Sequence, residues 1–486
     1  MYTDLRDFLE RLEAGGQLAH VAAPVSRDLE ITEIADRVSK GPAERNRALL
    51  FENVRGFDMP VAINLFGSAQ RMAWALGVED LGELTERLGA LLDLRLPQGL
   101  GGLVARGQDF LGALRAVGLG PTKIRRAPAQ QVIEREGATL AGIPALTCWP
   151  GDGGRFITLP QVVTRDPVSG TRNVGMYRLQ VVDEKRLLMH WQRHKGGAEH
   201  ERVARQEKKP TIPAAIVLGG DPATMWCASA PLPPDLDEYL LAGWLRGKPV
   251  EFVDCVSQPL EVPAQAEIVL EGHVDPNEHL PEGPFGDHTG YYTPVEPFPV
   301  FHLTALTRRA EPIYPTTVVG APPMEDVWMG KATERLFLPL IRLFLPEVAD
   351  LHMPAEGIFH NLVLVSIRKR YPGHARKVMH GLWGLGLLML AKAIVVFDEW
   401  VDVQNLSQAS WQALGNVDWS RDIVITQGPV DHLDHASSHH SYGGKIGIDA
   451  TAKLPEEGYS RGWPERTTMS AEVKARIDEV WRELGI

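Results

Sequence analysis

The middle of the sequence is a succession of short apolar runs separated by turn residues, and this pattern limits the fold more than any other feature of the chain. Between about residues 125 and 310 the runs include RFITLPQVVT, PAAIVLGGD, AEIVLEGHV and PVFHLTALTRR. Runs of this length that are rich in β-branched residues and bounded by glycine, proline or aspartate are typical of strands. Many strands at such short spacing predict a β-barrel or sandwich, interrupted here by one helix, PDLDEYLLAGWLRG.

The segments on either side of this region mix helical and strand patterns. LRDFLERLEAGG and ITEIADRVSKG carry apolar residues at helical spacing, whereas ALLFENV and MPVAINLFG have the pattern of short buried strands. Near the other end, LFLPLIRLFLPEV and SAEVKARIDEVWRELGI are helical, and Ser470 is placed to cap the last helix. The glycine-rich stretch over residues 94–123 has no strong period and is expected to be a connector.

A chain of 486 residues is too long for one ordinary hydrophobic core, so these patterns predict a multi-domain α/β protein. We expect an N-terminal α/β domain over residues 1–122, a central β-barrel domain over 123–310 and a C-terminal α/β domain over 311–486. The final helix, residues 470–486, is expected to mediate dimerisation, with packing on its own domain as the alternative.

Composition excludes several classes of protein. The formal net charge of -12 argues against a main role in nucleic-acid binding, which needs a concentrated positive field. The three cysteines are far apart and form no C-x-x-C motif, which disfavours a disulfide scaffold or a cysteine zinc site. The chain has no apolar run long enough for a membrane span, and its N-terminus lacks the pattern of a secretory signal. We therefore expect a cytoplasmic protein.

The stretch EGPFGDHTGYY places two carboxylates, Glu282 and Asp287, on a backbone stiffened by proline and bent by glycine. Two acids held close together have pKa values pushed apart, so that one can carry a proton near neutral pH. The alternative is a solvated hairpin turn. Phe285 and the pair Tyr291–Tyr292 favour the first interpretation, because they suggest an apolar wall beside the acids.

The motif RNVGMYR offers the amide oxygen of Asn173 and the guanidinium group of Arg178. Alternation along a regular strand puts these two side chains on opposite faces, unless the strand is interrupted near Gly175. A strand that simply ends in a surface arginine is the alternative interpretation.

The motif MHWQRHKGG holds His190 and His194 four residues apart, a spacing that suits two metal ligands on a helix. The segment has the pattern of a strand that leads into a Gly-Gly turn, however, so ordinary histidines are the alternative. Lys195, Gly196 and Gly197 offer a cation and bare backbone amides, which suit a phosphate group.

For two further stretches, residue types and spacing do not decide between a chemical and a structural role. Asp235 or Asp237 could cap the helix within the β-rich region, and Gly247 could end it. Spacing alone does not distinguish Glu238 from the neighbouring acids at this helix start. In DHLDHASSHHSYGGKIGIDATAK, four histidines could bind a metal or belong to a polar loop, and Lys445 could lie near an anion. The histidines are His432, His435, His439 and His440.

Together these motifs resemble the UbiD family of decarboxylases, in the expected order and over nearly the whole chain. The matching stretches are LRDFLERLEAGGQL, NVGMYR, MHWQRHKGG, PLEVPAQAEIVLEG, PEGPFGDHTGYY, YPGHARKVM and GIDATAK. The resemblance implies that the central domain is a split β-barrel related to flavin reductases, which binds prenylated FMN. It also implies a divalent metal, Mn²⁺ or Mg²⁺, at the cofactor phosphate with K⁺ nearby, and reversible non-oxidative decarboxylation of aromatic or α,β-unsaturated acids.

The resemblance assigns roles to individual residues by motif. Asn173, His194 and Glu238 would bind the metal, and their oxygen and imidazole donors suit Mn²⁺ or Mg²⁺. The catalytic set would be Arg178, Glu282 and Asp287, with aspartate where many family members have a second glutamate. The residues expected to line the flavin are Met176, Tyr177, Arg178, His190, Trp191, Gln192, Lys195, Gly196, Ser229 and Pro231.

In the implied mechanism, Arg178 orients the substrate and keeps Glu282 ionised, and a carboxylic acid protonates the carbon that has lost CO₂. Asp287 is expected to be this acid, with Glu282 as the rival. The quinone-biosynthesis branch of the family looks most similar, so the expected substrate is a 1,4-dihydroxy-6-naphthoate-like acid or a polyprenyl-4-hydroxybenzoate. A small aromatic or heteroaromatic acid is the alternative, followed by a redox flavoenzyme or an inactive scaffold subunit.

The resemblance also implies partners. A flavin prenyltransferase would supply the cofactor, and the enzyme would form a homodimer or homohexamer. A polyprenylated substrate would further imply peripheral contact with a membrane.

Overall fold

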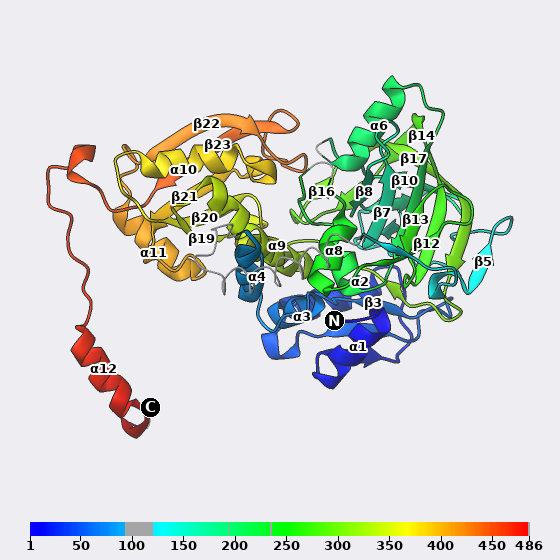
Figure 1. Cartoon of the computed structure of the whole chain (residues 1–486), viewed down its shortest axis with the longest axis horizontal. Coiled ribbons are helices and arrows are strands. Elements are labelled where there is room, and N and C mark those ends of the chain that lie inside the picture. Colours follow the sequence, from blue (N-terminus) through cyan, green and yellow to red (C-terminus); the bar gives the residue numbers. More distant parts are fainter. Residues whose placement is uncertain (93–119, 194, 234–235, 485–486) are drawn as a thin grey trace, which may run out of the picture.

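The computed structural model describes residues 1–92, 120–193, 195–233 and 236–484. A central β-rich body lies beside an N-terminal domain and a C-terminal domain, and the last helix extends away from all three (Figure 1). The predicted connector over residues 94–123 lies almost entirely outside the described ranges. Among the helices within them, none is both long enough and apolar enough to cross a membrane.

The N-terminal domain begins with helix α1 (Leu5–Ala14), which is capped by the Asp4 side chain. Its sheet has the order β1-β2-β3-β18, and β18 comes from beyond the central domain to pair in parallel with β3. The strands are β1 (Leu18–Val21), β2 (Ala48–Phe51), β3 (Val61–Ile63) and β18 (Tyr314–Pro315). The other helices are α2 (Glu30–Lys40), α3 (Ala69–Ala75) and α4 (Gly82–Leu92).

The main sheet of the central domain has the strand order β6-β9-β10-β17-β14-β11-β7-β8, with β5 added beside β17. Its centre is the long antiparallel pair of β14 and β17, whose register shifts near Gly272 and again before His279. Such irregularities bend strands and let a sheet curl. The strands are β5 (Val132–Glu134), β6 (Phe156–Ile157), β7 (Pro160–Arg165), β8 (Arg172–Gly175), β9 (Leu179–Val181), β10 (Arg186–Met189), β11 (Ile212–Leu218), β14 (Ile268–Glu282) and β17 (Glu296–Arg308).

The helix predicted to interrupt these strands is α8 (Glu238–Arg246). Asp237 caps its start by accepting a hydrogen bond from the backbone N–H of Tyr239, and Gly247 ends it in the left-handed conformation at φ 67°. Both predicted end signals are therefore confirmed. Nearby elements are α6 (Gly196–Gln206), α7 (Pro222–Cys227), the sheet β13-β12-β4 and the hairpin β15-β16. The strands of these last two are β4 (Thr122–Lys123), β12 (Glu251–Asp254), β13 (Glu261–Pro263), β15 (Phe285–Gly286) and β16 (Tyr292–Thr293).

The C-terminal domain has a sheet of order β19-β20-β21-β23-β22, with parallel pairing from β20 through β21 to β23. The strands are β19 (Val348–His352), β20 (Leu362–Ile367), β21 (Ala393–Asp398), β22 (Ile423–Pro429) and β23 (Tyr442–Asp449). The helices are α9 (Glu325–Phe344), α10 (His374–Trp383) and α11 (Leu406–Asn416). The predicted fold class, α/β domains on both sides of a curled β-sheet, is confirmed (Figure 1).

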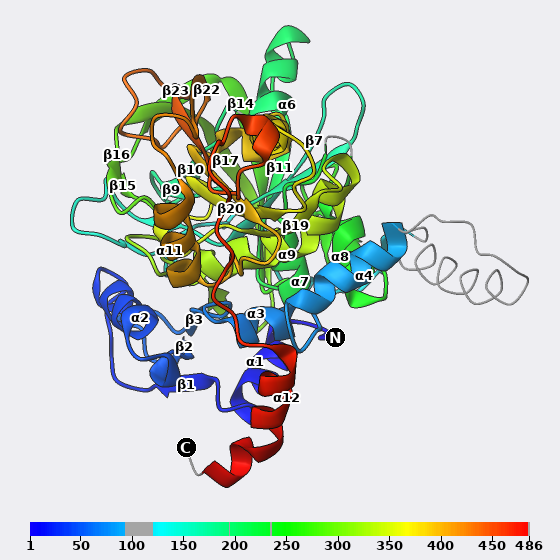
Figure 2. The same cartoon turned by 90° about the vertical axis from the view of Figure 1, so that its left-hand side faces the viewer.

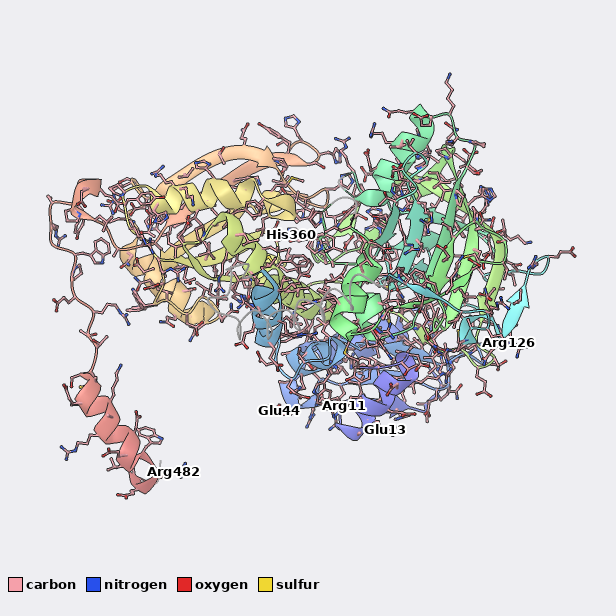
Figure 3. The ribbon with its side chains drawn as sticks, in the orientation of Figure 1. Arg11, Glu13, Glu44, Arg126, His360 and Arg482 are labelled. Carbon is pink, nitrogen blue, oxygen red and sulfur yellow. The ribbon has the colours of Figure 1, made fainter. Side chains whose placement is uncertain are left out.

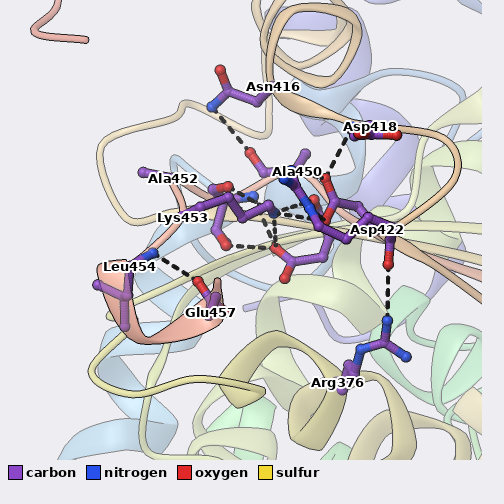
Figure 4. Close-up of polar contacts among 12 residues, drawn as sticks. Arg376, Asn416, Asp418, Asp422, Ala450, Ala452, Lys453, Leu454 and Glu457 are labelled. Carbon is purple, nitrogen blue, oxygen red and sulfur yellow. Dashed lines mark hydrogen bonds and ion pairs between the residues drawn. The ribbon is translucent and has the colours of Figure 1, made fainter. Parts of the chain in front are cut away.

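The motif GIDATAK holds the end of β23 through a buried polar cluster (Figure 4). The ammonium group of Lys453 donates to the backbone oxygens of Asp449 and Thr451, and it lies 3.5 Å from the Asp422 carboxylate. Asn416 donates to the backbone oxygen of Ala450. These contacts satisfy the buried charge of Lys453, so this part of the motif stabilises the domain.

Helix α12 (Ala471–Val480) begins at the predicted cap, where Ser470 accepts a hydrogen bond from the backbone N–H of Val473. It continues as a 3₁₀ turn over Trp481–Leu484 and stands clear of the body in Figure 1. In Figure 2, viewed from the side on which it extends, α12 is seen in front of α1. Within the described residues, every residue of α12 except the half-buried Val480 is exposed, and the helix does not pack on its own domain.

Candidate active site

The stretch EGPFGDHTGYY joins the end of β14 to the small hairpin of β15 and β16. Glu282 has no exposed surface and Asp287 is 6% exposed, so the solvated-hairpin interpretation is wrong. Phe285 is buried beside them, as predicted for an apolar wall. Tyr291 and Tyr292 are instead largely exposed and do not contribute to this wall.

Arg178 binds both acids of this stretch. Its Nε and Nη2 atoms donate to the two oxygens of Glu282 at 2.7 and 2.9 Å, and its Nη1 donates to Asp287. Nη2 also donates to Thr293 at 3.0 Å, and the guanidinium group lies over the Phe285 ring. Strand β8 ends at Gly175, so the interruption needed for Arg178 to face the site is present. The interpretation as a surface arginine is wrong.

Electrostatics keep both acids ionised in this arrangement. Burial by itself would raise the pKa of Glu282, but hydrogen bonds from His190 and Arg178 outweigh it and lower the pKa to about 2. Burial would likewise raise the pKa of Asp287, and the charges and hydrogen bonds of His288 and Arg178 lower it well below its usual range. The expectation that one acid of the ligand-free pair carries a proton is therefore not met.

His288 carries the proton that Asp287 lacks. Its Nδ1 lies 2.7 Å from Asp287 Oδ1. Burial by itself would lower the pKa of His288. The neighbouring Asp287 carboxylate more than offsets this effect, and the resulting pKa is about 8. Sequence reasoning missed this residue, although it directly follows the acid within the same motif.

Three glycines let neighbouring side chains pack directly on the backbone beside the motif NVGMYR. A Cβ atom on Gly196 would meet the side-chain oxygen of Asn173 at 1.9 Å, and one on Gly175 would meet the Tyr177 ring at 2.2 Å. Gly197 lies similarly close to Trp191. The glycine pair begins helix α6 rather than the predicted turn, and the Gly197 N–H donates to the Tyr177 hydroxyl. The other backbone amides of the first turn have no partner within the helix, and such amides suit a phosphate group.

Two buried ring nitrogens in the segment before α6 have no hydrogen-bond partner in the described part of the chain. They are Nε1 of Trp191 and Nε2 of His190. His190 uses its Nδ1 toward Glu282, at 3.2 Å, and burial lowers its pKa, so the free nitrogen is an acceptor. One unused donor and one unused acceptor in a buried site fit a polar heterocycle such as a flavin.

The remaining predicted flavin contacts border the same region. The Met176 N–H donates to the backbone oxygen of Ala228, which places the turn containing Ser229 and Pro231 beside NVGMYR. Burial lowers the pKa of Lys195. Gln192 follows β10 in the short segment before α6.

Asn173 and Glu238 lie close together, because Glu238 accepts a hydrogen bond of 2.9 Å from the backbone N–H of Val174. Burial raises the pKa of Glu238 to about 7. A carboxylate and an amide oxygen are ligands that Mn²⁺ or Mg²⁺ would accept. His194 lies outside the described residues, and within those residues no group of three or more His, Cys, Asp and Glu side chains could hold a metal.

The histidine-rich stretch joins the C-terminal domain to the loop of Asp287. His432 lies 2.7 Å from a Glu296 oxygen, and the rings of His435 and Tyr291 are 4.2 Å apart. Lys445 does not lie near an anion, because its buried ammonium group donates to the backbone oxygens of Met389 and Ala391.

Three models of one family match consecutive parts of the chain. The N-terminal domain of 3-octaprenyl-4-hydroxybenzoate carboxy-lyase matches residues 9–91, its Rift-related domain matches 122–322, and its C-terminal domain matches 327–450. The chain belongs to the UbiD family. It is a UbiD-type carboxy-lyase, a prenylated-FMN decarboxylase of aromatic or unsaturated acids, as the sequence motifs predicted.

Relatives of this UbiD protein cover it along its whole length. A protein of Aquifex aeolicus, described as uncharacterized, is 50% identical over 100% of this chain and 99% of its own. The closed form of vanillic acid decarboxylase from Sedimentibacter hydroxybenzoicus is 28% identical with a TM-score of 0.87, covering 99% of both chains. An evolved dimeric form of the UbiD-class enzyme HmfF from Pelotomaculum thermopropionicum, in complex with prFMN, is 27% identical with a TM-score of 0.79, covering 98% of this chain and 100% of its own.

The Arg178 ion pairs generate a prediction about stability. The folded-state pKa of Glu282, about 2, lies below its ordinary value of 4.5, so its ionised form stabilises the fold above pH 4.5. This contribution is lost as the pH falls from 4.5 toward 2. Glu282→Gln should therefore lower the free energy of unfolding by about 3 kcal/mol at pH 7, with a shallower decline below pH 4.5 than the wild type.

Urea unfolding at a series of pH values measures both quantities. Glu44→Gln is the matched control, because Glu44 is exposed on the N-terminal domain (Figure 3). Its unfolding curves should follow the wild type at each pH. Identical pH profiles for the wild type and Glu282→Gln would contradict the assigned ion pair.

Proposed function

We propose that this UbiD enzyme catalyses the reversible, non-oxidative decarboxylation of an aromatic acid in quinone biosynthesis. The observation that carries the proposal is the buried set of Arg178, Glu282 and Asp287, near Trp191 and His190, whose ring nitrogens have no hydrogen-bond partner within the described residues. The substrate is either a 1,4-dihydroxy-6-naphthoate-like acid or a polyprenyl-4-hydroxybenzoate. A small aromatic acid is the alternative, favoured by the likeness to vanillic acid decarboxylase.

Prenylated FMN would lie against Tyr177, Trp191 and the start of α6, and when bound it supplies an electron sink for the carbon that loses CO₂. Trp191 Nε1 would donate to the ring system and His190 Nε2 would accept from it. Asn173 and Glu238, together with His194, would hold a divalent cation at the cofactor phosphate, with K⁺ nearby. A flavin prenyltransferase would supply the cofactor.

Different side chains of the protein would bind the substrate and transfer the proton. Arg178 is the permanent cation beside which the substrate carboxylate binds. Glu282 stays ionised, because its two oxygens are engaged by Arg178 and one of them also by His190. Both contacts hold it as a counter-ion, which disfavours it as the proton donor.

Asp287 is better placed to donate the proton, because its Oδ1 faces His288. When a substrate carboxylate competes for Arg178, Asp287 loses part of the interaction that keeps it ionised. A proton then moves from His288 Nδ1 to Asp287. As the bond to CO₂ breaks, the electron pair remains with the ring carbon, and the Asp287 proton forms the new C–H bond.

The C-terminal domain is proposed to cover the bound substrate. This chain has a TM-score of 0.87 with the closed form of vanillic acid decarboxylase and 0.79 with its open form. The contacts of His432 with Glu296 and of His435 with Tyr291 would hold the domain in the covering position. Closure excludes water from a site in which a carbanion-like centre must be protonated selectively.

The enzyme is proposed to be a homodimer or homohexamer in which α12 packs on a second copy of the chain. Val473, Ile477, Trp481 and Leu484 are 38–52% exposed and recur at helical spacing, so they form one unpartnered apolar stripe. The helix stands away from its own body, which leaves the stripe free for another chain (Figure 1). The dimeric HmfF structure supports an oligomer in this class.

The catalytic assignment predicts that Asp287→Asn and Arg178→Ala lose decarboxylation while still binding flavin. General acid catalysis contributes typically 100- to 10,000-fold, so kcat for Asp287→Asn should fall by about that factor. Protein co-expressed with a flavin prenyltransferase is assayed for CO₂ release and for exchange of deuterium into aromatic products. Asp58→Asn, an exposed aspartate of the N-terminal domain, is the matched control. Normal turnover by both variants would overturn the assignment.

The metal assignment predicts that Asn173→Ala and Glu238→Ala co-purify with less Mn²⁺ and less prenylated FMN than the wild type. The loss follows because two of the proposed ligands anchor the cation that holds the cofactor phosphate. Metal analysis and the flavin absorbance of purified protein measure it. Glu251→Ala, on the exposed face of β12, should retain both. Full retention by Glu238→Ala would contradict the proposed site.

The proposed packing of α12 on a second chain predicts that a charge on its apolar stripe changes the oligomeric state. Ile477→Asp places a charge on the apolar stripe and should shift the molar mass toward the monomer, because burying an unpaired carboxylate is costly. Light scattering coupled to size-exclusion chromatography measures this shift. Arg476→Asp introduces the same side chain on the same helix outside the stripe and should leave the mass unchanged. A wild-type monomer, or equal masses for all three proteins, would refute the proposal.

A further inference from the structure

The turn that carries Asp287 is covered by residues of the C-terminal domain. His288 lies between β15 and β16, whereas Phe359 and His360 lie just before β20. The ring of Phe359 stacks on that of His288 with centroids 5.3 Å apart, and Nε2 of His360 lies 3.3 Å from Nε2 of His288. Figure 3 shows His360 where the C-terminal domain faces the β-rich body. His288 is therefore held between Asp287 on one side and a separate domain on the other.

The backbone just before His360 has a strained conformation. Ile358 and Phe359 have φ angles of 49° and 42°, in the left-handed region that residues other than glycine rarely adopt. Phe359 also packs directly on helix α9, because a Cβ atom on Gly330 would meet the Cβ atom of Phe359 at 3.0 Å. Strained backbone persists only where the surrounding structure enforces it, and it is concentrated at functional sites. The fold thus fixes the position from which His360 meets His288.

The two facing histidine rings differ in charge. Burial by itself would lower the pKa of His288, but the Asp287 carboxylate more than offsets this effect and the pKa is about 8, so His288 is a cation at neutral pH. Burial lowers the pKa of His360 to about 4, so this ring is neutral. A neutral ring can accept the Nε2 hydrogen of His288, whereas a second cation at this distance would repel it.

Asn361 determines which nitrogen of His360 carries the hydrogen. The Asn361 side chain is a hydrogen-bond partner of His360. Nδ1 of His360 and the side-chain oxygen of Asn361 are both buried, and neither has another partner within the described residues. Nδ1–H therefore donates to this amide oxygen, which leaves Nε2 of His360 as an acceptor. Asn361, His360, His288 and Asp287 form one chain in which every donor faces an acceptor.

This chain determines which nitrogen of His288 gives up its proton. Nε2–H is donated to His360, so the N–H bond that breaks is the one at Nδ1, 2.7 Å from Asp287 Oδ1. The proton moves to Oδ1, the electron pair stays on Nδ1, and both side chains become neutral. The neutral His288 ring keeps its hydrogen on Nε2, where His360 continues to accept it. The transfer thus needs neither a rotation of the ring nor a change of tautomer.

We propose that His360 is a positioning residue for the proton donor, and that it acts by accepting the Nε2 hydrogen of His288. This inference rests on the proposed decarboxylation and deepens it, since it names the residue that aligns the donor with Asp287. His360 belongs to the C-terminal domain, so the alignment exists only while that domain covers the site. An uncovered site would lack an aligned proton donor.

Two substitutions separate an accepting role of His360 from a packing role. His360→Leu removes the acceptor, whereas His360→Gln keeps an amide oxygen at the end of the side chain. His380→Leu is the matched control, because His380 is exposed on α10 of the same domain. Holoenzyme is prepared by co-expression with a flavin prenyltransferase. Assays of CO₂ release give kcat and KM as functions of pH, and absorbance gives the bound flavin.

His360→Leu should lower kcat by about 10- to 100-fold, as expected for losing a hydrogen bond to a charged group, with KM and bound flavin unchanged. Activity needs protonated His288, so the wild-type kcat should fall as the pH rises through about 8. A hydrogen bond to the charged form raises a histidine pKa, so this fall should begin about one pH unit lower in His360→Leu. His360→Gln should stay within about threefold of the wild type, and His380→Leu should match it.

The pKa of His288 is also measured without turnover. Titration of the histidine Hε1 signals in NMR spectra gives this value, and His288→Gln identifies the signal. The carboxylates that raise the pKa, those of Asp287, Asp326 and Asp431, are present in every His360 variant. A lower pKa of His288 in His360→Leu than in His360→Gln therefore reports the contact between the two rings.

Equal losses of kcat in His360→Leu and His360→Gln would indicate a packing role and overturn the inference. An unchanged pKa of His288 in His360→Leu, or an effect confined to KM or bound flavin, would also overturn it. Wild-type turnover by both His360 variants would refute the inference and leave the proposed function intact. A lowered pKa of His288 without CO₂ release or deuterium exchange from any aromatic acid would support the contact while refuting the proposed decarboxylation.

Discussion

A single buried cation, Arg178, sets the arrangement of the whole site. Its fork of donors is engaged by Glu282, Asp287 and Thr293, which come from the end of β14 and the hairpin that follows. Two carboxylates without this guanidinium group would repel each other in a site from which water is largely excluded. The cation fixes the loop, keeps both acids ionised without ligand, and offers the carboxylate of a substrate a position to compete for.

The features around Arg178 would serve different steps of the proposed reaction. The glycines at the start of α6 let Asn173 and Trp191 pack against that helix, and a ring nitrogen of Trp191 and one of His190 have no partner within the described residues. His288 stores a proton next to the acid, and the C-terminal domain brings His360 against it from the opposite side. Under the proposed function, the cofactor, the proton and the substrate would be bound by three separate parts of the fold that meet at one loop.

Local signals in the sequence were sufficient where a structure depends on nearby residues. The cap at Asp237, the end of α8 at Gly247 and the cap at Ser470 follow from residue types within one helical turn, and all three are present. The proposed catalytic set of Arg178, Glu282 and Asp287 depends on the family resemblance, because the spacing of Arg178 and Glu282 along the chain does not indicate that strand β8 ends at Gly175. The sequence alone is also compatible with a solvated turn at Glu282 and Asp287, and the burial of both side chains excludes it.

Other features depend on contacts that no local pattern encodes. The exposure of Tyr291 and the start of a helix at Gly196 follow from how the C-terminal domain and β8 pack around these segments. His360 lies far along the chain from His288, and only folding brings the two rings together.

The return of the chain to its N-terminal sheet has a consequence for biosynthesis. Strand β18 pairs with β3, and the Glu325 side chain accepts a hydrogen bond from the backbone N–H of Phe66, so the first domain is completed by residues made after the β-rich body. The ribosome synthesises the chain from its N-terminus, so the edge of strand β3 stays unpaired until β18 has been made. Such an edge pairs readily with other chains. Heterologous production of this protein is thus most vulnerable to aggregation while the central domain is being synthesised.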